Sequence, residues 1–83
     1  MSVFRITINH GPPVEFEPNR QEAFVNDSVF WFNADQEAHW PSLIDRPIAP
    51  NSPSNPVAFS TARTIDYICN LHPNETGQII VKP

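Results

Sequence analysis

The stretch Tyr67–Val81 reads YICNLHPNETGQIIV and places the only cysteine, Cys69, three residues before His72. Apolar residues alternate with polar ones on either side of this spacing, which predicts two strands joined by a tight connection. Cys69 ends the first strand on its apolar face, so its sulfur should point toward the core. We expect His72 to lie in the loop with Pro73, and Gly77 to release the chain into the last strand.

Shorter strand patterns precede this stretch. Apolar and polar residues alternate over residues 4–8 and 14–17, and residues 29–32 are apolar on both faces, as expected of a central strand. Breaks are expected at residues 18–21 and at the turn pair Asn26-Asp27. Residues 57–60 can form one further strand. With no helical period, the pattern predicts an all-β sandwich of about seven short strands.

One connection is unusually long for so small a chain. Residues 41–56 should carry little regular structure, because proline lacks a backbone donor and restricts the residue before it. A connection of this length indicates a functional or packed loop. Its prolines are Pro41, Pro47, Pro50, Pro53 and Pro56.

The composition of the chain bounds its size and partners. Its 83 residues are 40% hydrophobic and 11% aromatic, which predicts a single domain over residues 1–83 with a small core. The net charge is −4 and the few basic residues are scattered, which argues against nucleic-acid binding. No apolar run is long enough to cross a membrane. The N-terminal MSVFRITI lacks the features of a signal peptide. We therefore expect a cytoplasmic protein as the chain is written, or a periplasmic one if a leader has been removed.

Two segments carry a family resemblance. Val25–Asn33, followed by His39, resembles the V-G-D-x-V-x-W-x-N…H segment of the cupredoxins. Tyr67–Val81 resembles their Y-x-C-x-x-H-P-x-M-x-G-x-I-x-V ending, with the short Cys-to-His loop of the plastocyanin and amicyanin group. The resemblance covers about half of the chain and implies a cupredoxin-like Greek-key β-sandwich with one copper ion. His39, Cys69 and His72 match the three equatorial copper ligands of the family.

Glu75 stands where the family has its axial methionine, and this is the main departure. A carboxylate is a hard anionic ligand that favours Cu(II), whereas a thioether is soft and tolerates Cu(I). The His2Cys-plus-Glu set is similar to that of the red-copper nitrosocyanins, rather than to an ordinary type 1 copper site. Alternatively, Glu75 points to solvent. The axial position would then be empty or taken by water or a backbone carbonyl, such as that of Ala38.

A second departure concerns Trp40. It follows His39 where the family often has Asn, Ser or Thr, whose side chain ties the ligand loops together by hydrogen bonding. Hydrogen bonds of this kind orient metal ligands, so the rigidity of the site is an open question in the sequence. His10 lies in a His-Gly-Pro-Pro turn and is expected to be exposed, not a ligand.

The resemblance implies electron transport in complex with a redox partner protein, and we expect a monomer. An apolar patch around His72, formed by Trp40, Pro41, Leu71 and Pro73, is the expected docking surface. Asp35, Glu37, Asp45 and Glu75 could make the mouth of the site acidic and favour basic partners. No substrate pocket or acid/base pair is evident, so we do not expect an enzyme. Three alternatives stay open: a copper carrier or sensor, a red-copper site with an open position for small molecules, and a metal-free interaction module.

Overall fold

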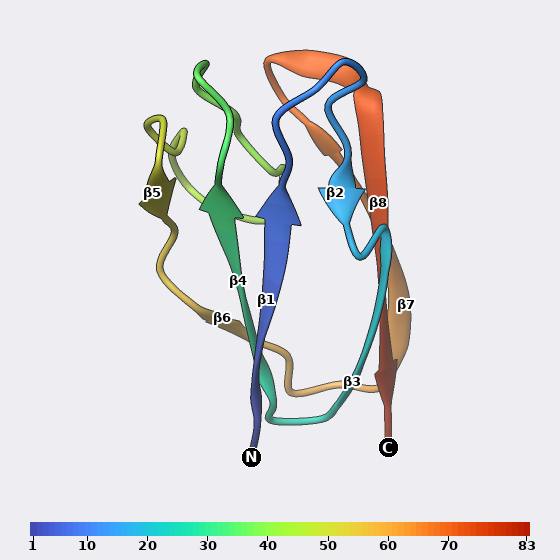
Figure 1. Cartoon of the computed structure of the whole chain (residues 1–83). Coiled ribbons are helices and arrows are strands. Elements are labelled where there is room, and N and C mark those ends of the chain that lie inside the picture. Colours follow the sequence, from blue (N-terminus) through green and yellow to red (C-terminus); the bar gives the residue numbers. More distant parts are fainter.

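Two β-sheets pack face to face in the computed structural model, which describes all of residues 1–83 (Figure 1). The first sheet has the order β2-β1-β4-β5, with β6 pairing beside β4. Its strands are β2 (Phe16–Glu17), β1 (Val3–Ile8), β4 (Ser28–Asn33), β5 (Ser52–Pro53) and β6 (Val57–Ala58). The second sheet has the order β3-β8-β7. Its strands are β3 (Arg20–Phe24), β8 (His72–Lys82) and β7 (Arg63–Cys69).

The directions of the strands place the loop after β4 and the β7–β8 turn at the same end of the sandwich. β1 runs parallel to β4, β3 runs parallel to β8, and β7 and β8 form an antiparallel hairpin. Both chain termini lie at the lower end in Figure 1, while the loop after β4 and the β7–β8 turn meet at the upper end. The structure contains no helix long and apolar enough to cross a membrane.

The core between the sheets is built on three aromatic side chains. The Tyr67 ring packs edge-on against Phe16 and Trp31, with ring centroids 4.9 and 5.4 Å away. The Trp31 Nε1–H donates to the Tyr67 hydroxyl at 3.2 Å, so the one polar group of each ring is paired. Trp31 therefore fills the core as expected. The other buried apolar members are Ile6, Ile8, Val29, Ile48, Phe59, Cys69, Ile79 and Val81.

Gly77 lies directly opposite Tyr67 in the β7–β8 hairpin. A Cβ built on Gly77 would collide with the Tyr67 ring, including its hydroxyl oxygen at 2.5 Å. The absence of a side chain is therefore what lets the tyrosine lie across β8 and reach Trp31.

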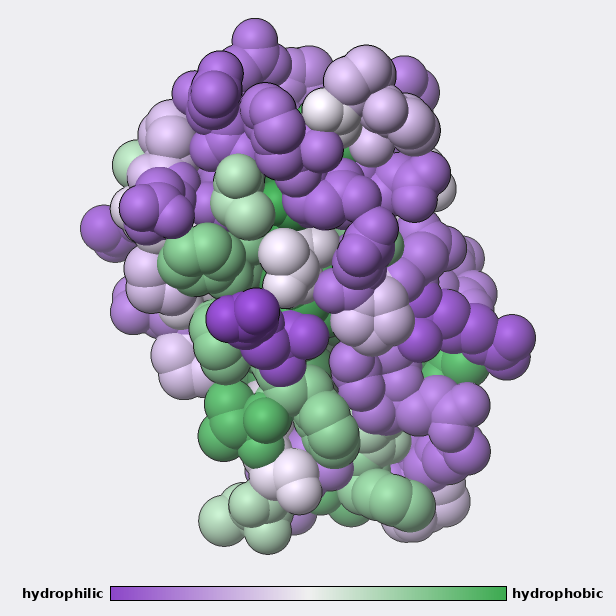
Figure 2. Space-filling model, viewed as in Figure 1, coloured by the Kyte–Doolittle hydropathy of each residue, from purple (hydrophilic) through white to green (hydrophobic).

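The outer face of the first sheet is partly apolar. Figure 2 shows apolar side chains gathered over the lower half of this sheet, around a strongly polar one. Val3 is exposed, and Phe30 and Phe32 are half-buried because they alternate with the buried Val29 and Trp31. The guanidinium of Arg5 lies 5.5 Å from the centroid of the Phe32 ring.

The prediction of about seven short strands is confirmed and is wrong in two details. Eight strands form, and three of them, β2, β5 and β6, have only two residues. The expected break at residues 18–21 ends earlier: β3 begins at Arg20, where pairing with Gln78 of β8 supplies backbone partners. Asn26 does occupy the predicted turn, with φ of 71°.

The second error concerns His72, which opens β8 instead of lying in a loop. Only Asn70 and Leu71 separate the two strands, and His72 pairs with Cys69. Pro73 is tolerated there because β3 joins β8 only from Gln78 onward, so the early part of β8 lacks that neighbour. The proline-rich segment 41–56 has little regular structure, as predicted, and holds only the short β5.

Candidate metal centre

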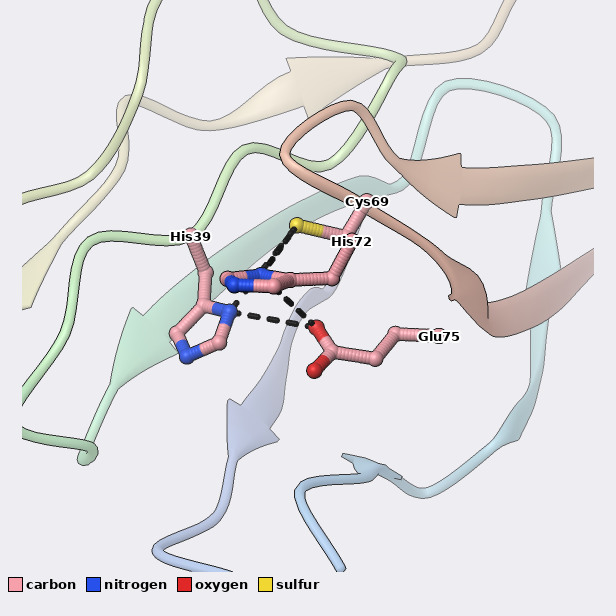
Figure 3. Close-up of side chains that lie close together, drawn as sticks. All are labelled: His39, Cys69, His72 and Glu75. Atoms are coloured by element: carbon pink, nitrogen blue, oxygen red, sulfur yellow. Dashed lines mark hydrogen bonds and ion pairs between the residues drawn. The ribbon is translucent and has the colours of Figure 1, made fainter.

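Four side chains converge at the upper end of the sandwich (Figure 3). One potential ligand atom from each of His39, Cys69, His72 and Glu75 lies within 4.8 Å of every other. The Cys69 Sγ lies 3.8 Å from Nδ1 of His39 and 3.7 Å from Nδ1 of His72. The Glu75 Oε1 lies 3.1 Å and 3.6 Å from the same two nitrogens. The structure thus brings together all four residues singled out in the sequence.

The two sheets contribute unequally to this cluster. His39 lies in the loop that follows β4 of the first sheet, whereas the other three belong to the β7–β8 hairpin of the second. The hairpin register is interrupted here: Ile68 pairs with Thr76, but Cys69 pairs with His72. Residues 73–75 are thus extra on the β8 side. This bulge supplies Glu75 to the cluster.

The cluster has the spacing and the chemistry of a cation site. A tetrahedral ion with bonds of about 2.0–2.3 Å holds its donors about 3.3–3.8 Å apart, close to the distances found here. The Glu75 side chain is 14% exposed, and its Oε1 is buried without a hydrogen-bond partner. The oxygen faces imidazole nitrogens that present lone pairs when neutral. A bound cation would satisfy all of these atoms at once.

The solvent-pointing alternative for Glu75 therefore does not describe the structure. Its carboxylate lies inside the cluster, with Oε1 3.1 Å from His39 Nδ1 and 3.6 Å from His72 Nδ1. The bulge at residues 73–75 explains this orientation, which single-strand alternation would not have predicted.

The thiol of Cys69 is held by the segment that follows His39. The Trp40 backbone N–H points at Cys69 Sγ at 3.3 Å, and Pro41 forms a bridge with Cys69. The Asn70 N–H donates to the Trp40 carbonyl at 2.7 Å. Cys69 is fully buried, so these contacts fix the sulfur where water does not compete.

Ser42 ties the two ligand segments together, two residues beyond Trp40. Its backbone N–H donates to the Ile68 carbonyl at 2.8 Å, and its hydroxyl accepts from the Ile68 N–H at 3.1 Å. The Trp40 side chain instead donates to the Ile44 carbonyl at 2.9 Å and anchors the long loop. The open question about rigidity is answered by Ser42, which the sequence pattern did not single out.

The loop that carries His39 is organised by Asn33. Its side-chain amide donates to the carbonyls of Glu37 and Ile48, at 2.8 and 3.0 Å, and its Oδ1 accepts from the Asp35 N–H at 2.9 Å. Asn33 is completely buried, and its bonds to Ile48 and Asp35 lie away from solvent, whereas the bond to Glu37 is part-buried. This closes the turn between β4 and His39.

Asp35 lies beneath His39 and not at the mouth of the site, which corrects the expectation for that residue. Its Oδ2 is 2.7 Å from His39 Nε2 and its Oδ1 is 3.0 Å from Nδ1 of His10. The hydrogen bond from His39 is the main cause that lowers the pKa of Asp35 from 3.8 to about 2. His10 is exposed, as expected, yet it contacts the residue that supports His39.

The mouth of the site is formed by the edge of His72, which is 36% exposed, while His39 is 1% exposed. Leu71 beside it is 47% exposed. Pro41, expected in the apolar patch, is instead fully buried against the core. Glu37 is exposed and lies 3.9 Å from His72 Nε2. Asp45 is exposed as well, paired with Arg46 at 3.5 Å.

Solved structures similar to this chain were found, although no similar sequence was. No protein-family model and no curated protein matches the sequence. Among solved structures, a purple cupredoxin from Nitrosopumilus maritimus matches with a TM-score of 0.85 and 21% identity, covering 94% of this chain and 98% of that one. Amicyanin from Paracoccus versutus matches with a TM-score of 0.83 and 17% identity, covering 96% of this chain and 81% of that one. A reduced Cu(I) form of an amicyanin variant matches with 0.83 and 20%, covering 96% and 82%. The chain has the cupredoxin fold.

Proposed function

We propose that this chain binds one copper ion through His39, Cys69 and His72, with Glu75 as the fourth ligand, and carries single electrons to a partner protein. The convergence of four donor atoms within 4.8 Å of one another is the observation that carries the proposal. The bound copper would supply the one-electron chemistry, and the protein would fix the ligands around it.

The donor set favours a transition metal that accepts both nitrogen and sulfur. Two imidazoles and one thiolate are typical of copper electron-transfer sites, and also suit zinc. Copper is preferred because one of the similar structures is named as a reduced Cu(I) form. The burial of Cys69 and His39 keeps solvent away from two of the donors, which limits rearrangement of water when the charge of the site changes.

Glu75 gives the proposed site its particular character. Its carboxylate is anionic and hard, so it stabilises the more highly charged Cu(II) state and lowers the reduction potential relative to a thioether. A strong fourth ligand also moves the preferred geometry from trigonal toward tetragonal. We therefore expect a red-copper absorption spectrum rather than the blue one of a methionine-ligated site.

His72 is the proposed port for electrons, because it is the donor with the most exposed ring. Leu71 in the hairpin turn and Ile68 near the end of β7 are exposed apolar side chains of the same hairpin, at 47% and 38%. The Glu37 carboxylate close to His72 adds negative charge to this end, and the chain as a whole carries −4. A partner with an apolar contact surface and a basic rim would complement it.

The test is a Cu(II) titration of the purified protein, followed by visible absorption and EPR. One equivalent should produce an intense thiolate-to-copper band that disappears in Cys69→Ser and shifts toward a blue-copper spectrum in Glu75→Met. Glu37→Gln is the matched control for the glutamate, since Glu37 lies outside the cluster, and should leave the band unchanged. Absence of any charge-transfer band would overturn the copper-thiolate site, and saturation by zinc alone would exclude electron transfer.

Electron self-exchange measured by NMR line broadening separates the proposed function from copper delivery. An electron carrier should exchange electrons rapidly and keep its metal against a chelator. Slow self-exchange together with ready transfer of copper to a chelator would instead identify a carrier or sensor.

A further inference from the structure

We propose that Asp35 and His10 are positioning residues for the metal centre, which together hold His39 in the single tautomer and orientation that presents Nδ1 to the other three donors. The inference deepens the proposed function, and it rests on that function because it takes His39 to be a copper ligand. Neither residue belongs to the cluster of donor atoms itself.

The two nitrogens of the His39 ring have different roles: Nδ1 faces the other potential metal ligands, and Nε2 faces Asp35. Nδ1 lies among the donors, 3.1 Å from Glu75 Oε1 and 3.8 Å from Cys69 Sγ. Nε2 lies 2.7 Å from Asp35 Oδ2. A carboxylate only accepts hydrogen bonds, and the shorter contact, to Asp35, places the proton on Nε2. In a neutral ring Nδ1 then presents its lone pair, in competition with the acceptor oxygen of Glu75 at 3.1 Å. The ring is 1% exposed, so bulk solvent does not compete for either nitrogen.

Asp35 is itself fixed at three points. Its backbone N–H donates to Asn33 Oδ1 at 2.9 Å, and one carboxylate oxygen accepts from His39. The other oxygen, Oδ1, is 3.0 Å from His10 Nδ1. The carboxylate is 8% exposed, so rotation away from His39 would leave buried polar atoms unpaired. The contact with His10, whose own side chain is exposed, is a second support for this orientation of the carboxylate.

His10 is held in reach by a tightly closed loop between β1 and β2. The Asn9 N–H donates to the Glu15 carbonyl at 3.0 Å, and the Glu15 N–H donates to Asn9 Oδ1 at 2.7 Å. A Cβ on Gly11 would lie 2.5 Å from the Val14 nitrogen, so the loop takes this shape only with glycine there. A surface loop from the start of the chain thus supports a ligand at residue 39.

A merely structural ion pair would stabilise the fold without selecting a tautomer, and the two roles give different results. The primary readout uses the metal-free protein: the ¹⁵N shifts of the His39 ring, from long-range ¹H–¹⁵N NMR. The wild type should show only the Nε2–H form. Asp35→Ala should show both tautomers in exchange, and Asp35→Asn, which keeps an acceptor oxygen, should restore the Nε2–H form. An unchanged His39 tautomer in Asp35→Ala would overturn the proposal.

The second readout is Cu(II) affinity, measured by competition with a chelator. Asp35→Ala should weaken binding about 10–100-fold, the usual effect of removing a hydrogen bond to a metal-ligating histidine. His10→Ala should show a smaller loss in the same direction, and His10→Asn, which keeps a donor near the position of Nδ1, should recover it. Asp45→Ala is the matched control, because Asp45 is exposed and pairs only with its neighbour Arg46. Affinities within twofold of the wild type for both alanine variants would contradict the positioning role.

The two readouts separate this inference from the proposed function. If the wild type binds no Cu(II), the proposed function fails while the tautomer measurement still decides the role of Asp35. If Asp35→Ala does not fold, judged by its amide spectrum, His10→Ala carries the test. Some population of the second His39 tautomer in that variant supports the proposal, and none refutes it.

Discussion

The Tyr67 hydroxyl accepts a hydrogen bond from Trp31 Nε1 at 3.2 Å, and this bond joins the two sheets through the middle of the core. Thirty-six residues separate the partners in the sequence, and both side chains are buried. Burial is also the main cause that raises the pKa of Tyr67 to about 12. It is the only hydrogen bond between the rings of the aromatic core, and Tyr67 belongs to β7, the strand that ends in Cys69.

Tyr67→Phe should lower the free energy of unfolding by about 1–3 kcal/mol, because the buried Trp31 N–H loses its acceptor while the packing is kept. Urea unfolding of the metal-free protein measures this. Phe30→Leu on the outer face serves as an aromatic control with an expected effect below about 1 kcal/mol. A Tyr67→Phe variant as stable as the wild type would show that the bond contributes nothing.

Gly77→Ala should destabilise the protein by about 1–3 kcal/mol, since the new methyl group meets the Tyr67 ring and the ring has little room to move. Thermal unfolding of this variant beside the neighbouring, exposed Thr76→Ala gives the comparison. The threonine variant should stay within about 0.5 kcal/mol of the wild type. Equal stability of the two variants would mean that the Tyr67 ring shifts freely.

Glu75→Met should raise the reduction potential of the copper-loaded protein, because removal of a carboxylate ligand destabilises Cu(II) relative to Cu(I). A tenfold change in relative affinity for the two states corresponds to about 59 mV for a one-electron couple, and we expect a rise of at least this size. Protein-film voltammetry provides the measurement. In Glu37→Gln, where the charge is exposed and screened by salt, the shift should be smaller. A lower potential in Glu75→Met would contradict axial ligation.

Acid should destabilise the metal-free protein through two aspartates. The pKa of Asp35 is about 2, chiefly because His39 donates to it, and the pKa of Asp27 is lowered chiefly by the backbone N–H groups of Ser2 and Phe24. A carboxyl whose folded pKa is depressed stabilises fully above its ordinary value of 3.8, and this is lost as the pH falls toward 2. Urea unfolding between pH 6 and 2 should show that decline, and a shallower one in Asp27→Asn.

The sequence predicted most of the site because its residues follow a compact spacing. Cys69 and His72 lie at the two ends of one tight turn, and Glu75 follows within the same hairpin, so local geometry alone brings them close. His39 could be added from its place after the central strand and from the family resemblance, but not from local spacing, because its approach depends on how the two sheets pack. The position of Glu75 depends on the bulge at residues 73–75, which the alternation of apolar and polar residues does not predict.

The supporting residues were harder to foresee, because their roles depend on contacts between distant segments. Asp35 is an acidic loop residue in the sequence, and only the fold buries it between His39 and His10. Ser42 likewise acquires its role from Ile68, which lies 26 positions away. The extra strand β5 escaped prediction for a related reason: two residues are too few to show a period, and they form a strand by pairing with β4. The equally short β6 lies within the strand expected at residues 57–60.

Because the donor cluster is divided between the sheets, a metal ion bound by all four residues would link the two layers of the sandwich. His39 belongs to one layer and Cys69, His72 and Glu75 to the other, so all four meet only in the folded chain. An ion that binds the folded state alone adds RT ln(1 + [L]/Kd), about 2.7 kcal/mol at a free concentration 100 times Kd. For a small domain this is a large share of the total. The copper supply would then set how long each molecule survives unfolding and proteolysis.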